Sequence, residues 1–460
     1  MSKQMNNEEK LKWMTETPVE KLVCKLAVPT IISMLVSSFY NMADTFFLGR
    51  SKDSVIATGA VGVVFSLMAI IQAIGFFFGQ GCSNYISRKL GSKEIEMAEI
   101  MASIGFFSAL ILGFVLMILG LIFIEPLAWA LGSTDLILPK AIEYMRYILI
   151  GSPYMVASLV LNNQLRFQGS AFFSMIGITS GAVLNIVLDP ILIFKFDMGV
   201  SGAAIATIFS QFVGFCLLLW GVNTSGAIKI KLKNFKPSKY YYGELLAGGT
   251  PSFCRQGIAS VATICLNFAA KPYGEVAIAA MAVVSRIAMF ANSAIIGFGQ
   301  GFQPVCGFNY GAGLYKRVIK AFWFCVKFAF VFLLFVAVLG IIFAPKIVNA
   351  FGNGAEVGKI ATVALRYQCI ALPLSSFIVL SNMLLQTIRK PVRATILSVS
   401  RQGLVFIPLI IILPRVFGIV GIEVCQTVSD VVTFVVAIIL QIPMLRELNR
   451  EKDYSGTLGN

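Results

Sequence analysis

The strongest constraint on this chain is a succession of apolar stretches, each long enough to cross a lipid bilayer as a helix. Hydrophobic residues make up 57% of the 460 positions and charged residues only 13%, which excludes an ordinary soluble domain and a disordered chain. We therefore expect an all-α, polytopic membrane protein. The apolar windows predict twelve transmembrane helices, over residues 25–49, 54–82, 98–124, 139–163, 167–194, 200–222, 244–270, 276–302, 318–344, 358–386, 391–414 and 418–442.

The basic residues concentrate in alternate loops between these helices. The 37 Lys and Arg residues outnumber the 22 Asp and Glu residues, which gives a net charge of +15. Lys and Arg accumulate in cytoplasmic loops of membrane proteins, and the basic loops lie on the side of the two termini, above all in residues 228–240. We expect both termini to be cytoplasmic. The net positive charge is then explained by basic loops on the cytoplasmic side of the lipid bilayer, and no nucleic-acid partner is expected.

The basic stretch also marks the boundary between two halves. The predicted segments are a cytoplasmic N-terminal segment (1–24), a first lobe (25–222), a basic linker (223–243), a second lobe (244–442) and a cytoplasmic tail (443–460).

The two halves repeat each other at a constant offset in the residue numbering. The motif FGQG at 78–81 recurs at 298–301, and the same offset pairs Arg146 with Arg366, Tyr147 with Tyr367, Gly91 with Gly311, Gly132 with Gly352, Pro153 with Pro373 and Asn162 with Asn382. Six helices per half is an even number, so both halves enter the membrane in the same orientation. We expect two pseudo-symmetric six-helix bundles around a central cavity, as in alternating-access transporters, although a duplicated domain can serve another role. FGQG is interpreted as close helix packing.

Two carboxylates within the first lobe are candidates for a functional site. Asp44 and Asp189 lie inside apolar runs, where an acid is functional by default. At about 1.5 Å per residue, both reach a similar depth in the outer half of the membrane. Thr207 and Tyr144, on the sixth and fourth predicted helices, fall at the same level.

Each of these acids has an amide one turn away on the same helical face, Asn41 with Asp44 and Asn185 with Asp189. Like charges and desolvation both oppose ionisation of the two carboxylates together. Such a pocket can exchange a proton or hold a monovalent cation such as Na⁺ with oxygen ligands. The structural alternative is that Asp189 and Asn185 only cap or link helices. No other metal site is expected, because the chain has no His and its nine Cys residues show no clustered spacing.

The second lobe holds a different set of polar residues. Arg255 and Gln256 follow Pro251 in the seventh predicted helix, and Asp430 lies midway along the twelfth. One interpretation is an ion pair of Asp430 with Arg255 or Arg401, which cancels two buried charges. The other is that these residues face the cavity, where Asp430 attracts a cationic substrate.

Several motifs in both halves resemble the multidrug and toxic compound extrusion (MATE) family, closest to its prokaryotic DinF-like branch. They are Val28-Pro29, NMADTFFLGR (41–50), FGQG, GAVLNIVLDPILIF (181–194) and GVSGAAIAT (199–207). The resemblance implies cation-coupled antiport of amphipathic, mostly cationic compounds across the inner membrane of a prokaryote. Carried over by motif, the ion site comprises Asp44, Asn185, Asp189 and Thr207, with Tyr144 a weaker match. Pro29 matches a proline that bends the first helix, although proline is also tolerated in the first turn of any helix.

These observations together predict a secondary active multidrug efflux transporter. It antiports organic cations and other amphipathic drugs against H⁺ or Na⁺, is not an enzyme, needs no cofactor and is expected to be a monomer. The alternative within a related fold is a lipid-linked saccharide flippase, for which more cavity cations and extra helices are expected. A membrane-embedded enzyme or receptor is disfavoured because clustered catalytic residues and a sizeable soluble domain are both lacking in the sequence.

Overall fold

The structure is a computed structural model that describes residues 6–48, 54–225, 228–350 and 354–451. A few side chains within these ranges, among them those of Asn41 and Asp44, lie outside the described residues. Every regular element in the described ranges is a helix, and eleven helical segments there are long and apolar enough to cross a membrane. The twelfth span is α9 (Lys239–Ala270), which has sufficient length at 32 residues but carries Glu244 and Arg255. The predicted all-α, twelve-helix architecture is confirmed.

The first half of the chain supplies six spanning segments and two short helices. The spans are α2 (Val19–Leu48), α3 (Ser54–Gly91), α4 (Ile95–Ile122), α6 (Leu138–Phe167), α7 (Ala171–Pro190) with a π-helical turn η1 (Ile191–Lys195), and α8 (Gly199–Ser225). The short helices are α1 (Asn7–Glu16) and α5 (Ile124–Ala130). A capping box of Asn6 and Glu9 starts α1, a helix that apolar windows do not predict because it lies outside the spans.

The second half follows the same plan. After a short turn η2 (Leu232–Asn234), the segments are α9, the turn η3 (Lys271–Tyr273), α10 (Glu275–Gly311), α11 (Tyr315–Asn349), α12 (Ala355–Ala371), η4 (Leu372–Leu374), α13 (Ser375–Thr387), α14 (Pro391–Val399), the π-helical turn η5 (Ser400–Leu404), α15 (Phe406–Phe417) and α16 (Ile419–Arg450). Two spans are therefore built in pieces, α12 with α13 and α14 with α15.

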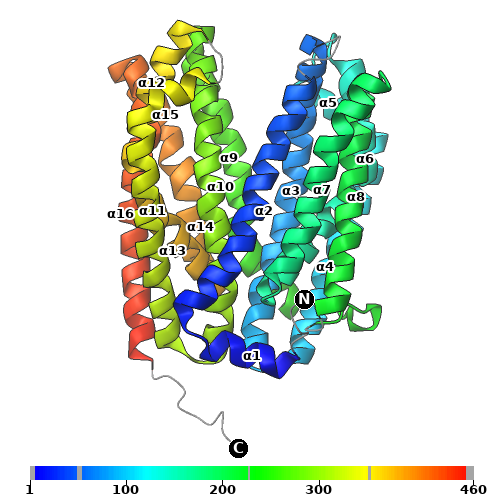
Figure 1. Cartoon of the computed structure of the whole chain (residues 1–460), viewed down its shortest axis with the longest axis vertical. Coiled ribbons are helices and arrows are strands. Elements are labelled where there is room, and N and C mark those ends of the chain that lie inside the picture. Colours follow the sequence, from blue (N-terminus) through cyan, green and yellow to red (C-terminus); the bar gives the residue numbers. More distant parts are fainter. Residues whose placement is uncertain (1–5, 49–53, 226–227, 351–353, 452–460) are drawn as a thin grey trace, which may run out of the picture.

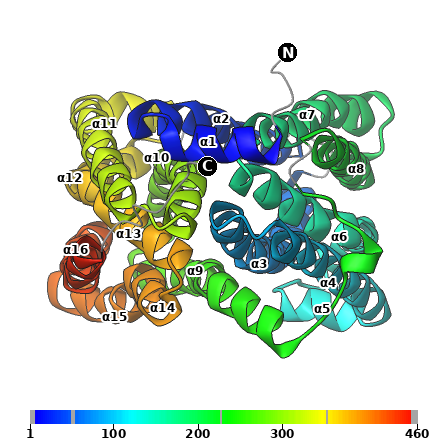
Figure 2. The same ribbon diagram turned by 90° about the horizontal axis from the view of Figure 1, so that it is seen from below.

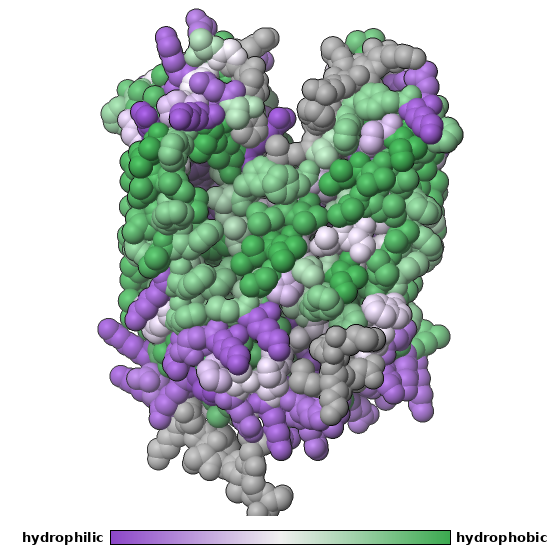
Figure 3. Space-filling model, viewed as in Figure 1, coloured by the Kyte–Doolittle hydropathy of each residue, from purple (hydrophilic) through white to green (hydrophobic). Residues whose placement is uncertain are grey.

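The two halves form two bundles that approach each other at one end and diverge at the other (Figure 1). The helices α3–α8 lie on one side and α10–α16 on the other, and α1 lies across the end where the bundles meet (Figures 1 and 2). The helix α2 runs obliquely between them and packs against both α7 and α10 (Figure 1). Space-filling atoms show a notch between the bundles at the opposite end, above a broad apolar band (Figure 3). We call these the α1 end and the open end.

The internal repeat is visible in matching side-chain contacts. Asn162 on α6 donates to Ser174 Oγ on α7 at 2.6 Å, and Asn382 on α13 donates to the backbone oxygen of Ala394 on α14 at 2.7 Å. The two acceptors follow the same numbering offset as the two asparagines (394 − 174 = 382 − 162). Each asparagine thus links the fourth span of its half to the fifth.

The FGQG motifs act as close-packing sites, as predicted. The first glycine of each motif lies against its own half, Gly79 against Asn163 and Gly299 against Met383. The second glycine of each lies against the other half. Gly81 contacts the backbone of Leu245 on α9, and Gly301 contacts Ala27 on α2. Because only glycine leaves room for these approaches, the motifs hold the two bundles together.

Candidate functional site

Three of the predicted ion-site residues meet inside the first bundle. The amide nitrogen Nδ2 of Asn185 lies 3.3 Å from Asp189 Oδ1 and 3.3 Å from Thr207 Oγ1. Asn185 is 1% exposed, Asp189 0% and Thr207 1%. The contact between Asn185 and Asp189 spans one helical turn, as the sequence predicted, and Thr207 brings in α8. A buried carboxylate, an amide and a hydroxyl therefore share one polar cluster in an apolar bundle.

The local sequence explains why this cluster forms at the end of α7. Pro190 follows Asp189 directly, and a proline has no N–H to donate back to the preceding turn. The chain continues as the π-helical turn η1, and π-helical segments are common at functional sites. The side-chain oxygen Oδ1 of Asn185 has no hydrogen-bond partner among the described residues. It can therefore accept a hydrogen bond or coordinate a cation.

The other predicted members are positioned less completely. Tyr144 is buried in α6 at 1% exposure, and α6 packs against both α7 and α8. Asp44 and Asn41 belong to α2, which packs against α7, but their side chains lie outside the described residues. Their part in the cluster stays a prediction.

In the second bundle, Asp430 pairs with Arg401 and not with Arg255. Arg401 Nε lies 2.8 Å from Asp430 Oδ1 and Arg401 Nη2 lies 3.2 Å from Oδ2. Gln426 Nε2 donates to the same carboxylate at 2.9 Å. Asp430 is 2% exposed, and Arg401 is supplied by the π-helical turn η5. This geometry favours the ion-pair interpretation of Asp430 over a cavity-facing one.

Arg255 and Gln256 lie on α9, both partly exposed. Arg255 has no ion pair among the described residues, so it stays a candidate for contact with substrate.

Pro29 lies inside α2, and the helix continues on both sides of it. The neighbouring Thr30 hydroxyl donates across to Gly297 O on α10 at 2.6 Å. A bending role for Pro29 stays a prediction.

A further buried acid, Glu423 on α16, was not predicted. It is 7% exposed and lines a small cavity of about 40 Å³ together with Ser285, Gln368 and Gln426. Glu423 falls near the start of its apolar window, where sequence reasoning assigns acids to a helix end. Glu423 is buried because side chains of α10 and α12 lie beside this part of α16. A search for apolar stretches in the sequence cannot detect such contacts between distant helices.

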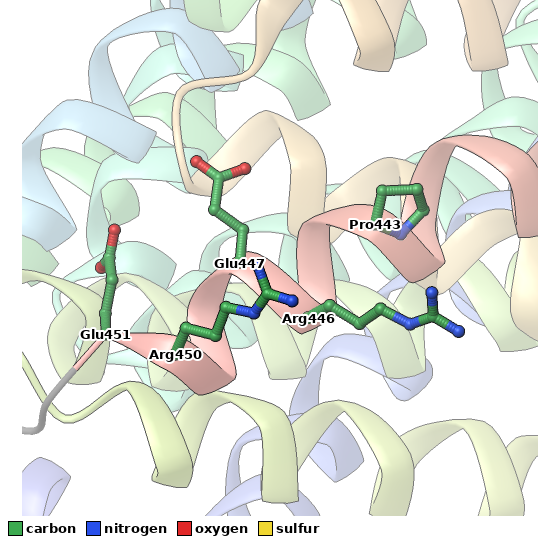
Figure 4. Close-up of a pocket in the computed structure, with 5 residues that line it drawn as sticks. All are labelled: Pro443, Arg446, Glu447, Arg450 and Glu451. Carbon is green, nitrogen blue, oxygen red and sulfur yellow. The ribbon is translucent and has the colours of Figure 1, made fainter.

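A larger surface pocket lies at the other end of α16. It has a volume of about 460 Å³ and is lined by Pro443, Arg446, Glu447, Arg450 and Glu451. Figure 4 shows these charged side chains spreading outward from the last turns of one helix. Glu447 is paired with Lys390 at 3.2 Å. A surface pocket lined by charged side chains of a single helix does not have the enclosed, apolar character of a substrate site.

Comparison with known proteins identifies the family. A family model described as MatE matches residues 29–191 and 251–412, which together cover more than half of the chain. The chain belongs to the MATE family. The family model matches once in each half, at starting positions 29 and 251, in agreement with the internal repeat.

Individual MATE relatives match over nearly the full length. The multidrug export protein MepA of Staphylococcus aureus (strain MRSA252) is 29% identical over 418 residues, which cover 90% of this chain and 92% of that protein. A multidrug resistance MATE transporter solved in an outward-facing conformation has a TM-score of 0.90 at 27% identity, over 98% of this chain and 100% of that one. A MOP superfamily transporter from Pyrococcus furiosus has a TM-score of 0.90 at 28% identity, with the same coverage. This MATE protein is thus a multi-pass membrane transporter and not an enzyme.

Proposed function

We propose that this MATE protein is a secondary active exporter of amphipathic, mostly cationic drugs, driven by H⁺ or Na⁺. The observation that carries the proposal is the buried cluster of Asn185, Asp189 and Thr207. An ionisable side chain inside a membrane bundle is unfavourable unless it has a function or a partner. The burial of Asp189 at 0% exposure inside the first bundle therefore makes it the candidate for ion coupling.

The cluster suits either coupling ion. A proton on Asp189 would neutralise the carboxyl in its apolar surroundings. Na⁺ would instead be held by oxygen atoms of Asp189, Thr207 and, after rotation of its amide, Asn185. We include Asp44 and Asn41 in the site because α2 packs against α7, and Tyr144 because it is buried in the neighbouring α6.

The coupling follows from alternating access of a central cavity. The bundles diverge at the open end and meet at the α1 end (Figure 1), and the chain resembles a transporter solved in an outward-facing conformation. If ion binding at Asp189 and drug binding favour opposite arrangements of the bundles, each ligand weakens the other by the same factor. An inward ion gradient then drives drug outward.

The multidrug substrate class is supported by the similarity to MepA, a multidrug export protein. The partly exposed Arg255 and Gln256 on α9 supply polar contacts, and the many Phe and Met side chains offer soft, polarizable surfaces for varied apolar cations.

The decisive experiment is uptake of a fluorescent organic cation into proteoliposomes under an imposed pH gradient or an imposed Na⁺ gradient. We expect one of the two gradients to drive accumulation in the natural protein and not in Asp189→Asn, which keeps the shape of the side chain but cannot ionise. The matched control is Asp197→Asn, the same change on an exposed residue of the same half, with accumulation unchanged. Full accumulation by Asp189→Asn would refute the proposed coupling site.

A further inference from the structure

The two bundles meet at the α1 end through a crossing of α3 and α10 that is built from glycine. Gly91 on α3 lies directly against the backbone carbonyl of Phe308 on α10, and Gly311 on α10 lies directly against that of Arg88 on α3. A methyl group on either glycine would overlap a backbone oxygen. Backbone atoms cannot turn away as a flexible side chain can, so the two helices can approach this closely only with glycine at these positions.

The contacts at this crossing are reciprocal between the two repeats. Gly311 is the repeat equivalent of Gly91, and Phe308 is the repeat equivalent of Arg88 (311 − 91 = 308 − 88). The glycine of each half therefore contacts the same position of the other half, three residues before the equivalent glycine, which is the reciprocity of an isologous interface. Gly307 contacts Ser87, its own equivalent (307 − 87 = 311 − 91). The crossing thus lies on the pseudo-two-fold axis that relates the bundles.

Buried polar contacts surround the crossing and join the same two bundles. Arg88 Nη1 donates to the backbone oxygen of Thr387 at 2.7 Å, and Thr387 Oγ1 donates to Asn84 Oδ1 at 3.0 Å. Asn84 and Thr387 are both 0% exposed. A further contact between the bundles lies about three turns before Gly311 on α10, where Arg166 on α6 donates to Gln300. Polar contacts of buried residues therefore join the two bundles on the same side as the crossing, where Gly91 itself is buried and Gly311 is partly exposed.

We propose that the Gly91–Gly311 crossing is the contact that closes the α1 end of the central cavity during transport, and that these two glycines set how strongly the closed arrangement is favoured. The inference rests on the alternating access proposed above. Only the arrangement with α3 and α10 in contact needs glycine at both positions. A side chain there raises the free energy of the closed arrangement and leaves an arrangement with separated helices unaffected.

The test uses Gly91→Ala and Gly311→Ala in the full-length protein, followed by hydrogen–deuterium exchange measured by mass spectrometry. We expect each variant to raise the population open at the α1 end about ten- to a hundredfold, as overpacking of this kind does. The observable is faster exchange in the last turns of α3 and α10, together with slower exchange at the open end.

Two matched controls separate closure from general loosening. Gly62→Ala makes the same change on α3 where a methyl group meets no atom within 4 Å, and it should leave exchange unchanged. Gly113→Ala creates a backbone overlap with Pro153 inside the first bundle, so its effect should stay within α4 and α6. Unchanged exchange at the crossing in both folded alanine variants, or the same pattern in Gly113→Ala, would overturn the proposal.

A second measurement covers the case in which the alanine variants do not fold. Asn84→Cys combined with Thr387→Cys places two thiols between α3 and α13, which join the two bundles beside the crossing, and an added oxidant can link them in a disulfide. Cross-linking should stop drug uptake and reduction should restore it, whereas full uptake by the cross-linked protein contradicts the proposal. The exchange measurement needs neither ion nor drug, so its outcome is independent of the Asp189→Asn test of coupling.

Discussion

Each bundle contains a buried aspartate, and the two aspartates meet side chains of different kinds. Asp430 is held by the guanidinium of Arg401 at 2.8 Å, so the pair is neutral overall and has no need of a transported ion. Asp189 instead meets the amide of Asn185, a neutral donor that stabilises a negative charge less than a cation does. The ion pair therefore favours a structural role for Asp430, whereas the coupling role of Asp189 stays a proposal.

The buried pair predicts a large loss of stability for Asp430→Asn. Removing one partner of a buried ion pair leaves the other charge uncompensated, which costs about 3–5 kcal/mol. We expect a clearly lower midpoint of thermal unfolding in detergent micelles. The control is Glu447→Gln, which breaks the exposed pair with Lys390 and should cost at most about 1 kcal/mol. Equal midpoints for the two variants would contradict the assignment of Asp430.

Lys10 on α1 predicts a stability that depends on pH. Its ammonium donates to Ser170 Oγ at 2.8 Å, the residue is 5% exposed, and burial lowers the pKa of Lys10 from 10.5 to about 8. Between pH 8 and 10.5 the unfolded chain then binds more protons than the folded one, so stability rises with pH across this window. Below pH 8 the buried charge is a net penalty of about 3 kcal/mol.

Lys10→Met tests this directly because it keeps the length of the side chain and removes the charge. We expect the variant to unfold at a higher temperature than the natural protein at pH 7, with the difference shrinking by pH 9.5. Lys12→Met is the matched control, since Lys12 is an exposed residue of the same helix and should show little difference at either pH. A constant difference between Lys10→Met and the natural protein at both pH values would refute the assigned pKa.

At the scale of the elements, the two halves use equivalent asparagines as links between helices. Asn162 joins α6 to α7 and Asn382 joins α13 to α14. A side-chain hydrogen bond between membrane helices contributes about 0.6–2 kcal/mol. We expect Asn162→Leu and Asn382→Leu to lower the unfolding midpoint by similar amounts. Asn223→Leu, on an exposed position of α8, should change it little, and a large effect in only one half would show that the links are not equivalent.

The sequence predicts those parts of the structure that leave a local pattern. Apolar windows predict the spans, and the one-turn spacing predicts that Asn185 reaches Asp189. Three features had no such signal because they depend on contacts between distant segments. These are the docking of α1 through Lys10, the buried Glu423 in the second bundle, and the choice of Arg401 over Arg255 as the partner of Asp430.

At the scale of the whole molecule, α1 forms a strap across the end at which the two bundles meet (Figure 1). Lys10 binds the first bundle at Ser170, while the backbone oxygens of Met14 and Thr17 accept hydrogen bonds from Asn309 and Arg317 of the second bundle at 3.1 and 2.6 Å. The strap is thus attached to both bundles in this arrangement. If the α1 end opens during transport as proposed, we expect the α1 segment to move with one of the bundles.

The orientation of the molecule in the membrane follows from where its charges lie. The α1 end holds both the start and the end of the described chain and the Lys-rich connection between α8 and α9 (Figures 1 and 3). Because positively charged loops remain in the cytoplasm, the α1 end should be cytoplasmic and the open end should face outward. A C-terminal fusion to green fluorescent protein should fluoresce, and a C-terminal fusion to alkaline phosphatase should be inactive. An alkaline phosphatase placed in the connection between α9 and α10 should be active, and the reverse pattern would invert the proposed direction of transport.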